Sequence, residues 1–328
     1  MKFIRFTKSG IYCPQADIYI DPWRRVKKAI ITHAHADHAR PGMGHYLAHH
    51  HSLPLLKSRL GENIVTQGLN YNEELYINGV RISLHPAGHI PGSSQVRLEY
   101  KGEVWVISGD YKTEFDGLSE AFESVKCHSF LTESTFGLPV YRWKDQDLVF
   151  EDINRWWSSN REMNKHSIIY AYSLGKAQRI LSGLNFDIGP VLVHPAIKEM
   201  NDCLISSGYS IPKTIELAGS KGQSAKSSII ISPPGAAEGK LLNPFKDRST
   251  AFVSGWMAVR GQRRRMNLDR GFVMSDHADW PGLNKAVRES GAEKVYVTHG
   301  YSDSFSRWLN EEGTAAEVVK TEFESEGQ

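Results

Sequence analysis

Short apolar stretches that end in polar residues dominate the first 135 residues of the chain. Val80–Leu84 alternates apolar and polar side chains, and Gln95–Tyr100 followed by Val104–Ile107 predicts a β-hairpin. Val26–Ile31 predicts another strand, which runs directly into His33. Active sites of layered α/β folds gather where strands end. We therefore expect functional side chains at these strand ends.

The hydrophobic pattern changes near Gly137. Asp145–Trp157 has helical spacing, Ser167–Tyr172 predicts a strand, and Leu174–Leu184 predicts a further helix. Val191–Val193 predicts the next buried strand. Alternation of strand and helix is typical of an α/β domain with a parallel sheet.

Short strands with polar ends return after Arg265. Gly271–Met274 runs into Ser275–Asp276–His277, and Lys294–Thr298 runs into His299. The last segment therefore has the pattern of the first domain and is expected to continue it. Such an interruption is plausible because surface loops tolerate inserted domains. We expect one domain from residues 1–136 and 263–328, with a second domain, residues 137–262, inserted into it.

Composition excludes several classes of protein. Hydrophobic residues make up 40% and charged residues 23%, as in ordinary globular proteins. No apolar stretch approaches the ~20 residues of a membrane span, and Met1–Gly10 lacks a signal-peptide core. We therefore expect a cytoplasmic protein without a membrane partner. Cys13, Cys127 and Cys203 form no CxxC pair, which argues against a disulfide framework.

The net charge of +2 neither requires nor excludes a polyanionic partner, because local patches matter more than the total. One basic run is present: Arg260, Arg263, Arg264 and Arg265, with Arg270 close behind. Such a run can bind backbone phosphates, or it can simply be a solvated loop.

The strongest chemical signal is the motif His33–Ala34–His35–Ala36–Asp37–His38. In an extended chain, His33 and His35 point the same way. Imidazole and carboxylate ligands suit Zn²⁺, with Mn²⁺ or Fe²⁺ as alternatives. One loop cannot enclose two ions, so further ligands should come from other strand ends: His89, Asp110 and His299. Each alone would more often be a structural residue, and together with the first motif they complete two sites.

These residues resemble the motifs of the metallo-β-lactamase fold and of its β-CASP nuclease branch, over essentially the whole chain. Asp21 is similar to the first motif, an aspartate that supports the metal loop. The remaining motif matches are His33, His35, Asp37 and His38, then His89, then Asp110, and in the β-CASP part Glu133, His277 and His299. The segment Tyr172–Gln178 resembles the glycine-containing turn and helix of β-CASP insertions.

The resemblance implies a fold and a division of roles. The fold would be an αββα sandwich with an inserted α/β β-CASP domain. His33, His35 and His89 would hold one divalent ion, and Asp37, His38 and His299 the other, while Asp110 would bridge them. Zn²⁺ is favoured over Mn²⁺, and a hydroxide activated by both ions would be the nucleophile. His277, paired with Glu133, would orient the phosphate or protonate the leaving oxygen; the alternative is a purely structural pair.

The implied activity is hydrolysis of phosphodiester bonds in a nucleic acid. Tyr12–Cys13–Pro14 and Ile20–Asp21–Pro22–Trp23 are similar to bacterial ligase-associated DNA exonucleases. The resemblance therefore favours a DNA exonuclease in repair, with a DNA ligase and a helicase as partners. An endo- or exonuclease of the mRNA 3′-end processing type is the alternative, and a non-catalytic binding module is the third reading.

Four further residues are candidates for contact with substrate phosphate. Ser173 and Lys176 stand at a predicted helix start, where backbone N–H groups bind anions. Lys112 closely follows Asp110, and Arg260 belongs to the basic run.

Overall fold

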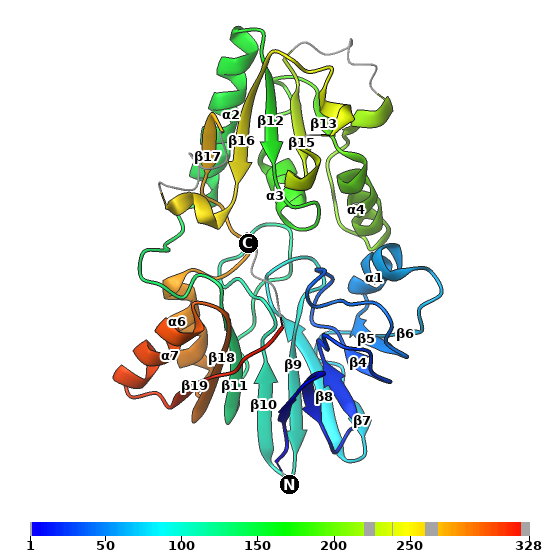
Figure 1. Ribbon diagram of the computed structural model, residues 1–328, viewed down its shortest axis with the longest axis vertical. Coiled ribbons are helices and arrows are strands. Elements are labelled where there is room, and N and C mark those ends of the chain that lie inside the picture. The colour runs from blue at the N-terminus through cyan, green and yellow to red at the C-terminus, as the bar shows by residue number, and fades with distance from the viewer. Residues whose placement is uncertain (1, 220–226, 238, 260–267, 323–328) are drawn as a thin grey trace. The chain divides into compact units, whose positions relative to one another are not determined.

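The chain divides into two compact units in a computed structural model that describes residues 2–219, 227–237, 239–259 and 268–322. Unit 1 comprises Met1–Arg142 and Asp276–Gln328, and unit 2 comprises Trp143–Ser275 (Figure 1). The second change of unit therefore comes after residue 275, not after 262 as expected. The reason is strand β17, Arg270–Phe272, which pairs with β16, Arg248–Val253, and so belongs to the sheet of unit 2.

Unit 1 contains two sheets within the described residues. The first has the order β1-β2-β3-β4-β5-β6, with antiparallel pairs from β1 to β3 and parallel pairs from β3 to β6. Its strands are Arg5–Thr7, Gly10–Cys13, Ile18–Ile20, Ala29–Ile30, Tyr46–His49 and Thr66–Leu69.

The second sheet of unit 1 has the order β19-β18-β11-β10-β9-β8-β7. Strands β7 to β10 pair antiparallel, and β10, β11, β18 and β19 pair parallel. The strands are Leu75–Ile77, Val80–Pro86, Ser94–Tyr100, Glu103–Ile107, Ser129–Ser134, Lys294–Gly300 and Ala316–Val318. Because β18 pairs with β11, the C-terminal segment completes a sheet that the N-terminal segment begins.

A shared apolar core lies between the two sheets. Alternate residues of β8, namely Val80, Ile82 and Leu84, pack in one cluster with Ile20 and Ile30 from the first sheet. Period-2 alternation places one face of a strand on a core, so the sequence pattern of β8 accounts for this packing. Helix α1, Ser52–Leu60, contacts β5 of the first sheet.

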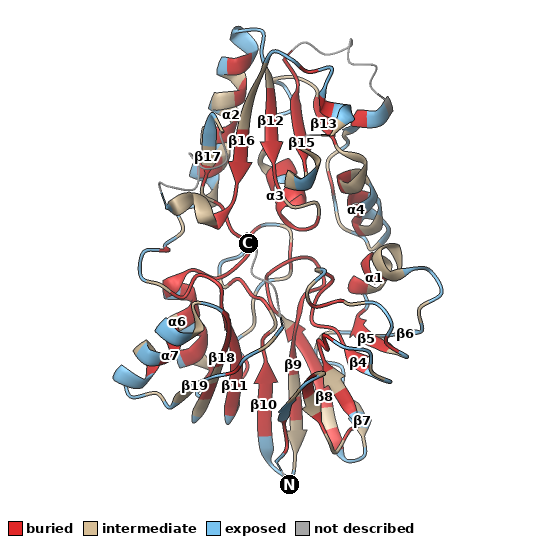
Figure 2. Ribbon diagram, viewed as in Figure 1, coloured by how far each residue is buried: buried red, intermediate tan, exposed pale blue. Residues whose placement is uncertain are grey.

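The opposite face of the second sheet is covered by α6, Trp280–Ser290, and α7, Ser302–Glu311. Helix α6 begins where the side chain of Asp279 accepts a hydrogen bond from Gly282 N, and it ends at Gly291 in left-handed conformation. Leu283 and Val287 stand one turn apart and face the sheet. Figure 2 shows that the strands are largely buried, whereas α6 and α7 also carry exposed residues.

Unit 2 is built on one sheet with the order β14-β13-β15-β12-β16-β17, and every pair in its described part is parallel. The parallel sheet predicted from the strand–helix alternation is confirmed. Its other strands are β12 His166–Tyr170, β13 Val191–Val193, β14 Ile215–Glu216 and β15 Ile229–Ser232. Among the described residues of this unit, the α-helices are α2 Gln146–Glu162, α3 Lys176–Gly183 and α4 Pro195–Ser206. Short 3₁₀ turns occupy Leu217–Gly219, Pro234–Ala236, Lys240–Leu242 and Gly255–Ala258.

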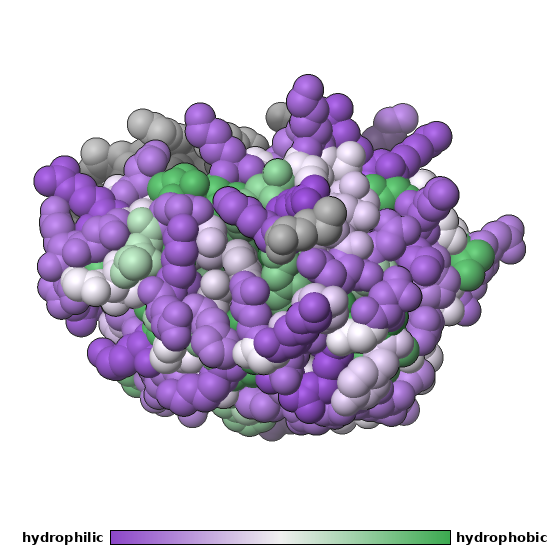
Figure 3. All heavy atoms as spheres, turned by 90° about the horizontal axis from the view of Figure 1, so that it is seen from below, coloured by the Kyte–Doolittle hydropathy of each residue, from purple (hydrophilic) through white to green (hydrophobic). Residues whose placement is uncertain are grey.

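The face of the molecule seen from below is mainly polar (Figure 3). The face of the molecule in Figure 3 is mostly hydrophilic, and its hydrophobic residues lie in small separate groups. Among the described residues, every helix is too short or too polar to cross a lipid bilayer.

Candidate metal centre

The loop from His33 to His38 follows β4, and a buried aspartate holds it in place. Asp21 follows β3 in left-handed conformation, with φ 41°. Its carboxylate accepts hydrogen bonds from Thr32 N at 2.8 Å and from His38 Nδ1 at 2.7 Å. Asp21 is therefore placed to fix both the start of the loop and the ring of His38.

Hydrogen bonds donated by Nδ1 orient two further imidazoles. His33 Nδ1 lies 3.0 Å from Thr32 Oγ1, which donates its own proton to Asp21. His89 Nδ1 lies 2.8 Å from the carbonyl oxygen of Asp276. A ring that donates from Nδ1 presents the lone pair of Nε2, which is the usual arrangement of metal-binding histidines.

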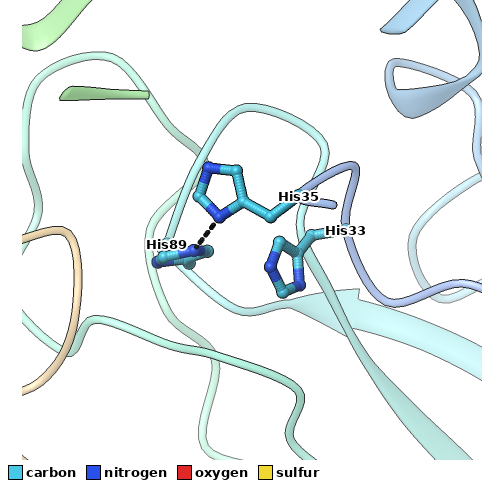
Figure 4. A group of neighbouring side chains, drawn as sticks. All are labelled: His33, His35 and His89. Atoms are coloured by element: carbon cyan, nitrogen blue, oxygen red, sulfur yellow. Dashed lines mark hydrogen bonds between the residues drawn. The ribbon is translucent and has the colours of Figure 1, made fainter. Parts of the chain in front are cut away.

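Three histidines from two loops converge on one point. His33, His35 and His89 each bring one ring nitrogen within 4.8 Å of the others, and Figure 4 shows their rings gathered together. His33 Nε2 is buried and has no hydrogen-bond partner among the described residues. A buried polar atom of this kind is costly unless a ligand satisfies it. The three nitrogens fit a zinc-like ion, for which imidazole is a preferred ligand.

Asp110 lies at the centre of the cluster. Its Oδ2 is 3.4 Å from His38 Nε2, 3.7 Å from His33 Nε2 and 4.0 Å from His89 Nε2. Three of the four His/Asp groups that could hold a cation in the described part of the chain include Asp110. These three groups are His33–His38–Asp110, His89–Asp110–His277 and Asp37–Asp110–His299. The structure thus brings all seven expected metal ligands into one region of unit 1.

Two backbone features allow this close approach. Gly109, with φ 56°, packs against Thr32, and a Cβ there would lie 2.7 Å from the Thr32 side chain. At Gly300, with φ 79°, a Cβ would overlap the backbone of Thr135. His299 itself has φ 56°, which is uncommon for a non-glycine residue and is often found at functional sites.

Burial and mutual charge set the protonation of the cluster. Burial, together with neighbouring imidazoles, lowers the pKa of His33 and of His89 well below the ordinary histidine value. Both rings are therefore neutral, which is the form that binds metal. Burial alone would lower the pKa of His38, but the carboxylates of Asp110, Asp37 and Asp21 outweigh it and raise that pKa. The His38 and His299 rings likewise outweigh burial at Asp110 and lower its pKa.

His277 and Glu133 form a buried pair beside the metal cluster. His277 Nδ1 lies 3.0 and 2.9 Å from the two carboxylate oxygens of Glu133. Tyr111 N also donates to Glu133 at 2.7 Å. The hydroxyl of Thr135 donates to the same carboxylate. The pair fixes the ring of His277, and one nitrogen of that ring lies in a group with His89 and Asp110.

One of the four phosphate-contact candidates, Lys112, lies in the same unit as this cluster. Lys112 is buried, and its Nζ forms an ion pair with Glu114 at 2.7 Å. Lys176 is buried in unit 2, with Nζ 4.6 Å from the ring centroid of Tyr172. Ser173 also belongs to unit 2, where its carbonyl accepts from Gln178 Nε2. Arg260, with Arg263–Arg265, lies outside the described residues.

Sequence reasoning found Asp21 but missed the other groups that orient the ligands. Thr32 and the carbonyl of Asp276 hold two of the histidines through Nδ1, and Thr135 helps to hold Glu133. Thr32 stands directly before the histidine motif, which is the signal that could have identified it. The carbonyl of Asp276 carried no such signal, because any residue supplies a backbone oxygen.

A buried cluster of imidazoles and carboxylates at strand ends defines the class of the site: a centre for divalent cations, of the kind that metal-dependent hydrolases use. No model of a known protein family matches the chain. The chain is 28% identical over 315 residues to a protein of Opitutus terrae named a probable DNA ligase. That match covers 94% of this chain and 30% of the other protein. It is 23% identical over 296 residues to the RNase aCSPSF2 of Saccharolobus solfataricus, covering 78% of this chain and 58% of that protein.

A crystal structure of a protein of unknown function from Enterococcus faecalis has a similar fold, with a TM-score of 0.58 and 12% identity. That likeness covers 90% of this chain and 80% of the other. The chain is a homologue of the metallo-β-lactamase/β-CASP nucleases. It spans less than two thirds of the length of either curated relative.

Proposed function

We propose that the protein is a metal-dependent nuclease that hydrolyses phosphodiester bonds, and that its substrate is DNA. The observation that carries this proposal is the position of Asp110, which shares three donor groups with histidines from separate loops. One carboxylate among several imidazole clusters suits a bridge between two cations. We infer that His33, His35 and His89 hold one cation, and that Asp37, His38 and His299 hold the other, with Zn²⁺ favoured over Mn²⁺.

Two divalent cations, when bound, would acidify a water molecule and stabilise negative charge on the attacked phosphate. The residues of the chain supply the rest of the chemistry. Asp21 and Thr32 keep the ligand rings in a fixed orientation, which limits reorganisation during the reaction. His277 is held through Nδ1 by Glu133, and we infer that its Nε2 donates a proton to the leaving oxygen or a hydrogen bond to the phosphate.

We propose further that unit 1 is the αββα sandwich of the metallo-β-lactamase fold. Its two facing sheets, with α1 on one side and α6 and α7 on the other, support this assignment. Unit 2, with its parallel sheet, would be the inserted β-CASP domain.

The relatives favour two substrates. The long alignment with a protein named as a DNA ligase supports DNA, and it makes a DNA ligase the partner that we favour. The resemblance to ligase-associated exonucleases adds a helicase as a further partner. The relative named as an RNase supports the second candidate, an RNA-processing endo- or exonuclease.

End-labelled single- and double-stranded DNA and RNA, incubated with the protein and Zn²⁺, Mn²⁺ or Mg²⁺, test the proposal. We expect single nucleotides to be released from one end of the DNA. Cleavage of RNA alone would overturn the DNA assignment and favour the second candidate. Binding without cleavage under every metal would instead favour a non-catalytic nucleic-acid-binding module.

A further inference from the structure

The loop of residues 112–123 in unit 1 is hydrogen-bonded at both ends to the residues that follow or end β8, just before His89. Lys112 N donates to the carbonyl of Ala87 at 3.0 Å, and Glu123 N donates to the carbonyl of Pro86 at 3.2 Å. At Gly88, with φ 73°, a Cβ would overlap the carbonyl oxygen of Lys112. The loop therefore packs directly on the residue that precedes His89.

The same loop is fastened at two more points. Gly92 N donates to Glu120 Oε2 at 3.1 Å. On the other side, Thr113 packs on Gly282, where a Cβ would lie 2.5 Å from Thr113 Oγ1. Gly282 is in the first turn of α6, shortly after His277. The loop thus spans from the His89 segment to the His277 segment.

The ring of Phe115 is exposed on this anchored loop. Its side chain is 63% exposed, although the adjoining Asp116 is buried. Asp116 accepts hydrogen bonds from Leu118 N and Ser119 N, which fixes the turn after Phe115. Phe115 follows Lys112 by three positions in the sequence, so the two Cα atoms are at most about 11 Å apart. A large apolar ring is thereby held in solvent near the candidate metal centre.

The acidic groups beside Phe115 are already paired. Glu114 forms an ion pair with Lys112 at 2.7 Å, and the Asp116 carboxylate is occupied by the turn. The charge of Glu114 is therefore offset by Lys112, and the Asp116 carboxylate is buried. An exposed aromatic face with its local charge offset is suited to stacking on a nucleobase, because every base has a π-face.

We propose that Phe115 is a substrate-positioning residue that stacks on a base of the nucleic acid strand next to the attacked phosphate. This inference rests on the proposed nuclease function. The inference gives the nucleic acid a contact with the protein that depends on its bases and not on its phosphates.

The test compares Phe115→Ala, Phe115→Trp and wild-type protein on two single-stranded oligonucleotides of equal length, of whichever sugar the wild type cleaves. One carries thymine or uracil bases, and the other carries abasic residues on the same phosphodiester backbone. We expect Phe115→Ala to raise KM for the base-bearing strand by roughly 5- to 150-fold, the range for loss of one base–aromatic stack. Phe115→Trp should restore it, and kcat and bound metal should change little. On the abasic strand, the alanine variant should match the wild type.

The matched control is Tyr76→Ala, because Tyr76 is also 63% exposed but lies on edge strand β7. Tyr76 pairs with Arg81 near the start of β8, whereas His89 follows the other end of that strand. Equal KM values for Phe115→Ala and wild type on the base-bearing strand would overturn the inference. So would an equal loss on the abasic strand, since the effect could not then come from stacking. A wild type that cleaves neither strand would count against the proposed function itself.

Discussion

Replacing Asp21 with asparagine tests whether this buried carboxylate maintains the metal loop. Asparagine tolerates the left-handed backbone at φ 41° and keeps the side-chain volume. It can still accept from Thr32 N through its carbonyl oxygen. However, Asp21 Oδ2 receives hydrogen bonds from Thr32 Oγ1 and, at 2.7 Å, from His38 Nδ1. An amide nitrogen at that position is itself a donor, so it cannot accept the hydrogen bonds from Thr32 Oγ1 and His38 Nδ1.

The magnitude follows from these contacts. Hydrogen bonds to a charged group contribute about 1.5–3 kcal/mol each, so loss of the two to Oδ2 in Asp21→Asn should lower the free energy of unfolding by roughly 3–6 kcal/mol. Loss of a partner that orients a ligand histidine commonly lowers metal affinity 10- to 100-fold, or about 1.4–2.7 kcal/mol. The affinity loss should fall on the cation held by His38.

The assay is competition of the metal-stripped protein with a chromophoric chelator for Zn²⁺, together with urea unfolding. The control is Asp17→Asn, because Asp17 also has positive φ but is exposed and accepts from Tyr12 OH at 2.8 Å. That variant should stay within about 0.5 kcal/mol of wild type. Wild-type zinc affinity in Asp21→Asn would refute the orienting role.

Three further outcomes follow from the same geometry. Asp110→Asn should lose bound metal and hydrolysis together by elemental analysis and turnover; retention of both metals would contradict a bridge. His277→Asn should keep its metal while kcat falls roughly 10²- to 10⁴-fold, and an unaltered rate would reject a catalytic role. Free Zn²⁺ at about 100 times its Kd should add about 2.7 kcal/mol to the free energy of unfolding. Identical unfolding curves with Zn²⁺ and with a chelator would argue against a cation bound to the folded state.

Local sequence identified the donors because the motifs that carry them begin at or shortly after the end of a strand. His89 and Asp110 follow strands whose alternation is plain, and β18 runs into His299. Strand lengths were less predictable. The expected strand Val26–Ile31 is limited to Ala29–Ile30. Residues 24–28 are largely exposed, and only Ala29 and Ile30 pair with both β3 and β5.

Side-chain directions in loops could not be predicted from sequence. Lys112 is two residues from Asp110, yet the chain turns so that its ammonium pairs with Glu114. The role of Thr32 depends on a hydrogen bond to Asp21, which approaches from a different strand. Residue spacing describes one segment at a time, whereas these contacts arise only when several segments pack together.

The most direct test of the central claim is crystallography of the zinc-soaked protein with anomalous difference maps at the zinc absorption edge. Our account predicts two strong peaks on either side of Asp110, one among His33, His35 and His89 and one beside Asp37, His38 and His299. Zinc peaks located away from Asp110, or a single peak that leaves one ligand set unused at saturating Zn²⁺, would contradict it.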